Sequence, residues 1–241
     1  MMRENFGRCI GHGVKFSRVS KDNEENFPGA VNVEQHYCIT DENEVYMVMK
    51  ASLAPGQAAE TMTPYNQCNH AYWNLSGDFS EATVVEHSLS LPTCDRLIEL
   101  GEGLMPTGNL PEVKNDKRFD FTDGFSKVGD RERLTGAIDG GGQPGIDHPF
   151  ALTGADLDAT NPKKLHVAAH LRGGSTQMSV YTTQPALVVY TGNFLPQVKD
   201  SKHRQHGAIC LETCSFNDAV NMKGREGWPK KGGVIGMGDE Y

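Results

Sequence analysis

Segments that alternate apolar and polar residues dominate this chain and predict β-strands. Residues 31–40 are apolar at every second position along much of their length, and residues 45–51 are rich in β-formers. The polar residues 41–44 between them predict a turn, so residues 31–51 are expected to form a hairpin. Four further segments are predicted to be strands: 87–91, 165–171, 178–183 and 187–191.

Helical patterns are weak in this chain. No window of about 12 residues repeats its apolar positions with a period of 3.6. The 27 glycines and 12 prolines interrupt the chain often. Gln184-Pro185 separates the last two predicted strands, because proline cannot donate to a strand ladder. Residues 140–145 predict a plain loop, since their glycines lack a phosphate-binding spacing. We therefore predict an all-β fold, with residues 1–241 forming one domain of short antiparallel strands.

Composition narrows the classes of function. The net charge of −8 and the lack of a basic run argue against nucleic acid or an anionic membrane as a partner. No segment approaches the roughly 20 apolar residues of a membrane span, and the first residues lack the apolar core of a signal peptide. The six cysteines lack the spacing of a disulfide scaffold. We therefore expect reduced thiols in a cytoplasmic protein.

The segment from Asn69 to Gly77 reads Asn-His-Ala-Tyr-Trp-Asn-Leu-Ser-Gly, which is a poor core pattern. An imidazole, amide groups and the flat faces of Tyr72 and Trp73 would suit a sugar site. His70 could be a general acid, a ligand, or a polar core group whose hydrogen bonds are satisfied. The segment alone leaves these alternatives open.

Two carboxylates are further candidates for chemistry. Glu212 lies in the apolar segment 208–213, where burying its charge would cost several kcal/mol unless it is paired. It could be a half-buried general base, or a strand-edge glutamate that faces water. Asp147 follows glycines and precedes His148-Pro149. It could cap a turn or accept hydrogen bonds from two sugar hydroxyls.

A metal site is not predicted. His166 and His170 have the i, i+4 spacing of a zinc helix but lack its glutamate. The segment is expected to be a strand, in which the two imidazoles would lie on one face but about 13 Å apart. The chain also lacks a Gly-x-Ser-x-Gly elbow for serine catalysis.

Taken in order, these segments resemble the aldose 1-epimerases, also called galactose mutarotases. Asn69 to Gly77 resembles the family's Asn-His-x-Tyr-Phe-Asn-Leu-x-Gly motif, and Gly145 to Phe150 resembles its Gly-x-Asp-His-x-Phe motif. Further matches are 27–29, 104–108, 119–121, 182–185, 190–195 and 211–213. The resemblance runs from about Val14 to Tyr241, and residues 1–13 match poorly.

The resemblance implies a fold, a reaction and roles for residues. The fold is a large antiparallel β-sandwich, and the reaction interconverts the α and β anomers of aldohexoses such as galactose and glucose. Glu212 would be the base and His70 the acid. The substrate-binding residues would be Asp147, Asn69, Tyr72 and Trp73. The family's reaction needs neither a metal nor an organic cofactor.

The chain departs from the family at its N-terminal end. From the resemblance we expect it to lack about a third of the family's domain, including an Asn-Arg pair and a His-Gly-Gly motif that bind the sugar in the family. A truncated sandwich should expose apolar faces and strand edges, so we expect self-association or a complementing N-terminal segment. Two alternatives follow: a non-catalytic sugar-binding or regulatory relative, or an inactive fragment. A phosphosugar epimerase is disfavoured by the net charge of −8.

Overall fold

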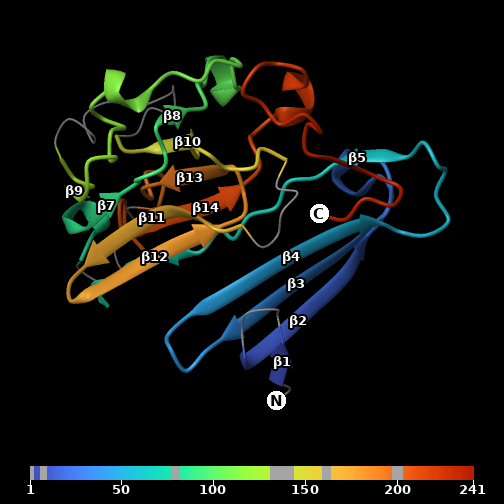
Figure 1. Cartoon of the computed structure of the whole chain (residues 1–241). Coiled ribbons are helices and arrows are strands. Elements are labelled where there is room, and N and C mark those ends of the chain that lie inside the picture. Colours follow the sequence, from blue (N-terminus) through green and yellow to red (C-terminus); the bar gives the residue numbers. More distant parts are fainter. Residues whose placement is uncertain (1–2, 6–9, 78–81, 131–143, 159–163, 197–202) are drawn as a thin grey trace. The chain divides into compact units, whose positions relative to one another are not determined.

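The computed structural model describes residues 3–5, 10–77, 82–130, 144–158, 164–196 and 203–241. Within these ranges the regular elements are antiparallel strands and short 3-10 turns (Figure 1). The prediction of an all-β fold is therefore confirmed. The chain divides into two compact units, Met1–Gln67 with Val234–Tyr241, and Cys68–Gly233. That residues 1–241 act as one domain stays a prediction.

The first unit is built on a four-stranded sheet in the order β1-β2-β3-β4. Its strands are β1 (Arg3–Asn5), β2 (Ile10–Ser20), β3 (Val31–Ile39) and β4 (Val45–Leu53). The 3-10 turn η1 (Glu24–Asn26) lies between β2 and β3, and β5 (Met62–Pro64) pairs with β15 (Val234–Gly236). Strands β3 and β4 confirm the predicted hairpin.

One face of this sheet carries apolar side chains at both ends of its strands, and among the described residues those at one end are buried. Val31, Ala51 and Leu53 form a buried cluster with Ile235. The strand register continues the same face to side chains that are 39% to 60% exposed. These exposed residues are Val14, Phe16, Ile39, Val45 and Met47.

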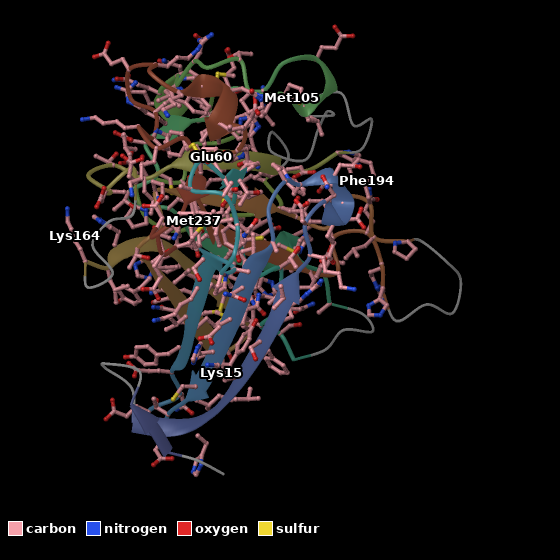
Figure 2. All side chains as sticks on the ribbon, turned by 90° about the vertical axis from the view of Figure 1, so that its right-hand side faces the viewer. Lys15, Glu60, Met105, Lys164, Phe194 and Met237 are labelled. Atoms are coloured by element: carbon pink, nitrogen blue, oxygen red, sulfur yellow. The ribbon has the colours of Figure 1, made fainter. Side chains whose placement is uncertain are left out.

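We expect these five exposed apolar side chains to drive self-association, because large exposed apolar patches mark sites of protein–protein contact. Phe16 is 57% exposed, and burial of a phenylalanine ring is worth about 1.5–3 kcal/mol. Phe16→Lys should therefore weaken association by about 10- to 100-fold, measured by sedimentation velocity across concentrations. Lys15→Gln is the control, since Lys15 (labelled in Figure 2) projects from the other face, 2.6 Å from Glu34. Equal effects of the two substitutions would contradict the prediction.

Two antiparallel sheets form the second unit, in the orders β6-β14-β13-β10-β8 and β12-β11-β7-β9. Their strands are β6 (Tyr72–Trp73), β7 (Ser88–Ser90), β8 (Arg96–Leu97), β9 (Ser126–Lys127), β10 (Asp147–Ala151), β11 (His166–Gly173), β12 (Thr176–Thr182), β13 (Ala186–Tyr190) and β14 (Ile209–Cys214). The 3-10 turns are η2 (Val84–Glu86), η3 (Glu102–Leu104), η4 (Val113–Asn115) and η6 (Ala219–Met222).

Side chains from both sheets fill a shared core in this unit. Phe150, Leu187 and Ile209 come from the first sheet, and Leu89 and Leu171 come from the second. All five are fully buried. The arrangement confirms the predicted β-sandwich, because apolar faces of two sheets enclose one core.

The four strands predicted in this half of the chain are found as β7, β11, β12 and β13. The prediction that His166 and His170 share one face is wrong. Strand β11 has a bulge between Val167 and Ala169, so His166 lies opposite Thr182 and His170 opposite Ser179. Because those two partners are three residues apart on β12, the imidazoles point to opposite faces.

The prediction for the cysteines also needs one correction. Cys38 is disulfide-bonded, whereas Cys68, Cys94, Cys210 and Cys214 are free. A disulfide depends on the approach of two backbones in space, which spacing along the sequence does not reveal.

Two further predictions concern the loop 140–145 and the cellular location of the protein. Most of the predicted loop 140–145 lies outside the described residues. No helix within the described ranges is long and apolar enough to cross a membrane. A cytoplasmic location stays a prediction.

Candidate functional site

Four side chains lie in one row across the first sheet of the sandwich. Asp147 of β10 lies opposite Tyr190 of β13. Cys210 of β14 lies between Tyr190 on one side and Tyr72 of β6 on the other. Directly opposite residues of antiparallel strands project from the same face. The row therefore gathers a carboxylate, a thiol and two phenols from segments far apart in the sequence.

Glu212 joins this face because it follows Cys210 by two residues on β14, and side chains alternate along a strand. Ile209 and Leu211, on the opposite face, belong to the core. Glu212 is only 8% exposed. Of the two alternatives that the sequence left open, the structure shows the buried carboxylate.

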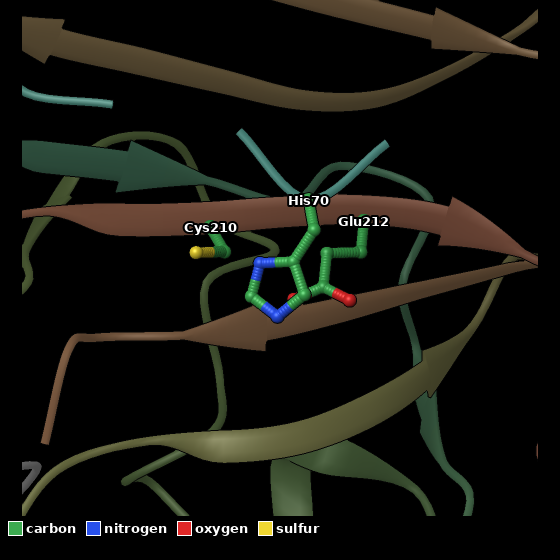
Figure 3. A group of neighbouring side chains, drawn as sticks. All are labelled: His70, Cys210 and Glu212. Atoms are coloured by element: carbon green, nitrogen blue, oxygen red, sulfur yellow. The ribbon is translucent and has the colours of Figure 1, made fainter. Parts of the chain in front are cut away.

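The carboxylate of Glu212 contacts one group through each of its oxygens. Its Oε1 lies 3.4 Å from Nε2 of His70 (Figure 3). Its Oε2 accepts a hydrogen bond from the thiol of Cys68, at 3.3 Å. The side chain of His70 is 53% exposed and that of Glu212 is 11% exposed. The pair therefore joins a shielded carboxylate to an accessible imidazole.

One aromatic ring stacks on the imidazole of His70, and a second ring contacts the first. The ring of His70 stacks on Tyr72, with centroids 5.1 Å apart and an angle of 17° between the planes. Tyr72 meets Tyr190 edge to face, with centroids 6.3 Å apart. Beside them, Asn69 Oδ1 accepts a hydrogen bond from the backbone N–H of Ala71 at 3.2 Å, which shapes the turn that carries His70.

Burial first, and the nearby carboxylates after it, raise the pKa values of the thiols and phenols around the site. Burial, followed by the charges of Glu212 and Asp147, raises the pKa of Cys210 to about 12. Burial and the hydrogen bond to Glu212 raise the pKa of Cys68 to about 11. The pKa of Tyr72 is also raised, by burial first. The thiols and phenols therefore stay neutral donors around Glu212 and Asp147 near neutral pH.

A buried network fixes the backbone just before Asp147. The Ile146 N–H donates to Thr191 Oγ1 at 2.9 Å, and Asn193 Nδ2 donates to the Ile146 carbonyl at 3.1 Å. The Thr191 hydroxyl and Asn193 Oδ1 lie 2.6 Å apart. Both side chains are buried. Residues of the 190–195 segment therefore position Asp147 through hydrogen bonds.

The structure brings His70, Glu212, Asp147 and Tyr72 together, with Asn69 next to His70. Trp73 is not part of this group. It lies opposite Ile209 on the other face of β6 and packs against the core.

Sequence reasoning missed three neighbours of the site. Cys210 could have been found from its i, i+2 relation to Glu212, and Tyr190 from its place in the 190–195 segment. Cys68 gave no signal, because only the fold brings it to Glu212.

Sequence comparison finds similar proteins along nearly the whole chain. A family model described as Aldose 1-epimerase matches residues 4–234. Galactose mutarotase of Bos taurus is 34% identical over 219 residues, covering 89% of this chain and 58% of that protein. Aldose 1-epimerase of Escherichia coli (strain K12) is 30% identical over 233 residues, covering 95% and 61%. The chain thus spans about three fifths of the length of these relatives.

Solved structures show the same fold. An aldose epimerase homologue from C. elegans has a TM-score of 0.69 and 21% identity, covering 95% of this chain and 62% of that one. Galactose 1-epimerase from Lactobacillus acidophilus NCFM has a TM-score of 0.70 and 23% identity, covering 95% and 60%.

Proposed function

The chain belongs to the aldose 1-epimerase family, and from this membership we propose that it is an isomerase that interconverts the α and β anomers of aldohexoses such as galactose and glucose. Relatives named galactose mutarotase and aldose 1-epimerase support the reaction. The observation that carries the proposal is the contact of Glu212 Oε1 with His70 Nε2, at 3.4 Å.

Ring opening of an aldohexose moves one proton off the C1 hydroxyl and another onto the ring oxygen. Both oxygens are bonded to C1, so a base and an acid that lie side by side can serve them together. In our proposal Glu212 takes the hydroxyl proton and His70, as imidazolium, donates to the ring oxygen. The C1–ring oxygen bond breaks as the C1 carbonyl forms.

Closure reverses the same transfers on the other face of the carbonyl. After rotation about the C1–C2 bond, the C5 hydroxyl oxygen attacks C1 and gives its proton back to His70. Glu212 returns its proton to the C1 oxygen, so both side chains recover their starting states. The scheme uses neither a metal nor an organic cofactor.

The neighbouring groups have assigned roles in this proposal. Asp147 accepts hydrogen bonds from sugar hydroxyls, and Tyr72 with Asn69 offers a flat face and an amide to the sugar. Cys68 is a positioning residue, because its thiol donates to the second oxygen of Glu212 at 3.3 Å. Trp73 is not given a role, since it packs on the core side of β6.

A second candidate is a sugar-binding protein without turnover. It is considered because the match covers 58% of the length of the bovine relative, so the comparison supports the reaction over that part only. A retained acid–base pair is not required for binding alone, which is why we place this candidate second.

Polarimetry tests the proposal. Freshly dissolved α-D-galactose and α-D-glucose should approach anomeric equilibrium faster with the purified chain than spontaneously. Calorimetry with galactose separates the two candidates. Saturable binding without acceleration, by protein with a folded circular dichroism spectrum, would support the binding candidate. Neither binding nor acceleration would refute both.

A further inference from the structure

Three metal-ligand types meet at the proposed catalytic pair. A ring nitrogen of His70, the sulfur of Cys210 and a carboxylate oxygen of Glu212 all lie within 4.8 Å of one another (Figure 3). Imidazole, thiolate and carboxylate are the three side-chain ligands that zinc uses in proteins. No other such group of three occurs within the described residues.

We propose that His70, Cys210 and Glu212 form a binding site for one Zn²⁺ ion that blocks the proton-transfer pair. The consequence for catalysis rests on the proposed function, whereas the binding itself does not. This inference departs from the sequence-based prediction of no metal site, which considered only His166 and His170.

The geometry is close to what zinc requires. Zinc–ligand bonds of about 2.0–2.3 Å in a tetrahedron place the ligand atoms about 3.3–3.8 Å apart. His70 Nε2 and Glu212 Oε1 already lie 3.4 Å apart. Cys210 and Glu212 are held two residues apart on β14. The movement needed to bring the three ligand atoms to the spacing of a zinc site therefore falls on the side chain of His70, which is 53% exposed.

The charges at the site favour a cation. Asp147 and Glu212 lie on the same face of the sheet as Cys210, so two carboxylates give this face a negative potential. The same potential attracts a divalent ion, and a bound ion in turn deprotonates a coordinating thiol.

The ligand set also selects the ion. A thiolate favours Zn²⁺ over Mg²⁺ or Ca²⁺, which prefer oxygen ligands. Three protein ligands leave a fourth position for water or a sugar hydroxyl. With Glu212 and His70 bound to the ion, neither can exchange a proton with the sugar, so Zn²⁺ should inhibit anomer interconversion.

Cobalt spectroscopy tests the site without sugar. We expect the reduced wild-type chain to bind one Co²⁺, with a thiolate-to-cobalt charge-transfer band that Zn²⁺ displaces. Cys210→Ser should abolish the band. His70→Ala should weaken Zn²⁺ binding by at least roughly 100-fold in calorimetry, because loss of even an outer partner of a metal ligand costs about 10- to 100-fold.

Two control variants remove the same residue types elsewhere. The thiol of Cys94 donates to the Ala168 carbonyl in the core, 3.7 Å away, and His170 contacts Ser179 on β12. Cys94→Ser and His170→Ala should bind cobalt as the wild type does. If Cys210→Ser failed to fold, the Zn²⁺ affinity of His70→Ala would still test the site, because His70 is exposed and its substitution should not prevent folding.

The outcomes separate this proposal from the proposed function. A cobalt band in a chain that shows no turnover would support the metal site and count against the isomerase. If the chain shows turnover that Zn²⁺ leaves unchanged, and no cobalt band, the result would support the isomerase and count against the metal site. A band that survives both Cys210→Ser and His70→Ala would overturn the site.

Discussion

Glu212→Gln should reduce anomer interconversion to near the spontaneous rate. The amide of glutamine has almost the shape of the carboxylate but cannot take the proton of the C1 hydroxyl. Positioned general bases contribute about 10²- to 10⁴-fold to a rate, so we expect a loss of kcat of that size. Polarimetry of α-D-galactose with wild type and variant at equal concentration measures it.

The loss should not come from unfolding. The amide oxygen can still accept the hydrogen bond from Cys68, now at 3.3 Å from Oε2. A carboxylate that is 8% exposed also carries a desolvation cost that the neutral amide avoids. We therefore expect the free energy of unfolding of Glu212→Gln to stay within about 1 kcal/mol of wild type, measured by urea titration.

Glu86→Gln is the matched control for this substitution. It makes the same change of charge in the same unit, at a side chain that is 75% exposed and lies 3.0 Å from Lys127. Surface ion pairs contribute only about 0–1 kcal/mol, so this variant should turn over like wild type. A wild-type rate in Glu212→Gln would show that another group is the base, and the mechanism would have to be abandoned.

The strands could be predicted where the signal is local. The hairpin of β3 and β4 combines alternation with a polar turn, and both features lie within one continuous segment. The position of Glu212 beside Cys210 likewise follows from alternation along β14. What the sequence could not decide was whether Glu212 faces water, because that depends on which strands flank β14.

Features set by tertiary pairing were beyond sequence reasoning. Tyr72 and Trp73 are adjacent aromatics on β6, and only the register with β14 places Tyr72 at the site and Trp73 against the core. The bulge in β11 leaves Ala168 and Ala169 both fully buried. Two alanines carry no local mark of such an irregularity.

Some residues that suggest sugar binding turn out to hold the backbone. Asn74 lies in the segment that resembles the family motif, yet its Nδ2 donates to the carbonyls of Ala82 and Gly207, at 3.1 and 2.9 Å. Asn193 is used in the same way near Asp147. An amide that would suit a sugar hydroxyl suits a buried carbonyl equally well, so residue type alone cannot separate these roles.

Gly145→Ala should destabilise the second unit by about 3–5 kcal/mol. The φ angle of Gly145 is +131°, and an added Cβ would lie 2.0 Å from Asn193 Oδ1 and 2.7 Å from Thr191 Oγ1. The strained backbone costs about 1–3 kcal/mol, and each buried hydrogen bond that breaks costs about 1–3 kcal/mol more. Urea unfolding measures the loss, which is large against a total stability of about 5–15 kcal/mol.

Gly154→Ala separates the collision from the backbone strain. Gly154 also has a positive φ, +71°, but an added Cβ would meet nothing within 4 Å. This variant should therefore lose only the cost of a left-handed backbone, about 1–2 kcal/mol. In an Asn193→Ala background the cost of Gly145→Ala should shrink, because the nearest obstacle is gone, and such coupling is expected for residues in contact. Equal losses in the two glycine variants would mean that the collision does not occur.

Gly145→Ala and Glu212→Gln should also differ in their effects on kcat and KM, given the roles proposed for Asp147 and Glu212. Gly145→Ala disturbs the backbone two residues before Asp147, which our proposal assigns to holding the sugar, so it should raise KM more than it lowers kcat of the folded protein. Glu212→Gln removes a group that acts in the transition state and should lower kcat with little change in KM. Steady-state polarimetry over a range of galactose concentrations measures both. If Gly145→Ala left KM unchanged while still destabilising the unit, Asp147 would not be a sugar ligand, and its place in the row would be structural.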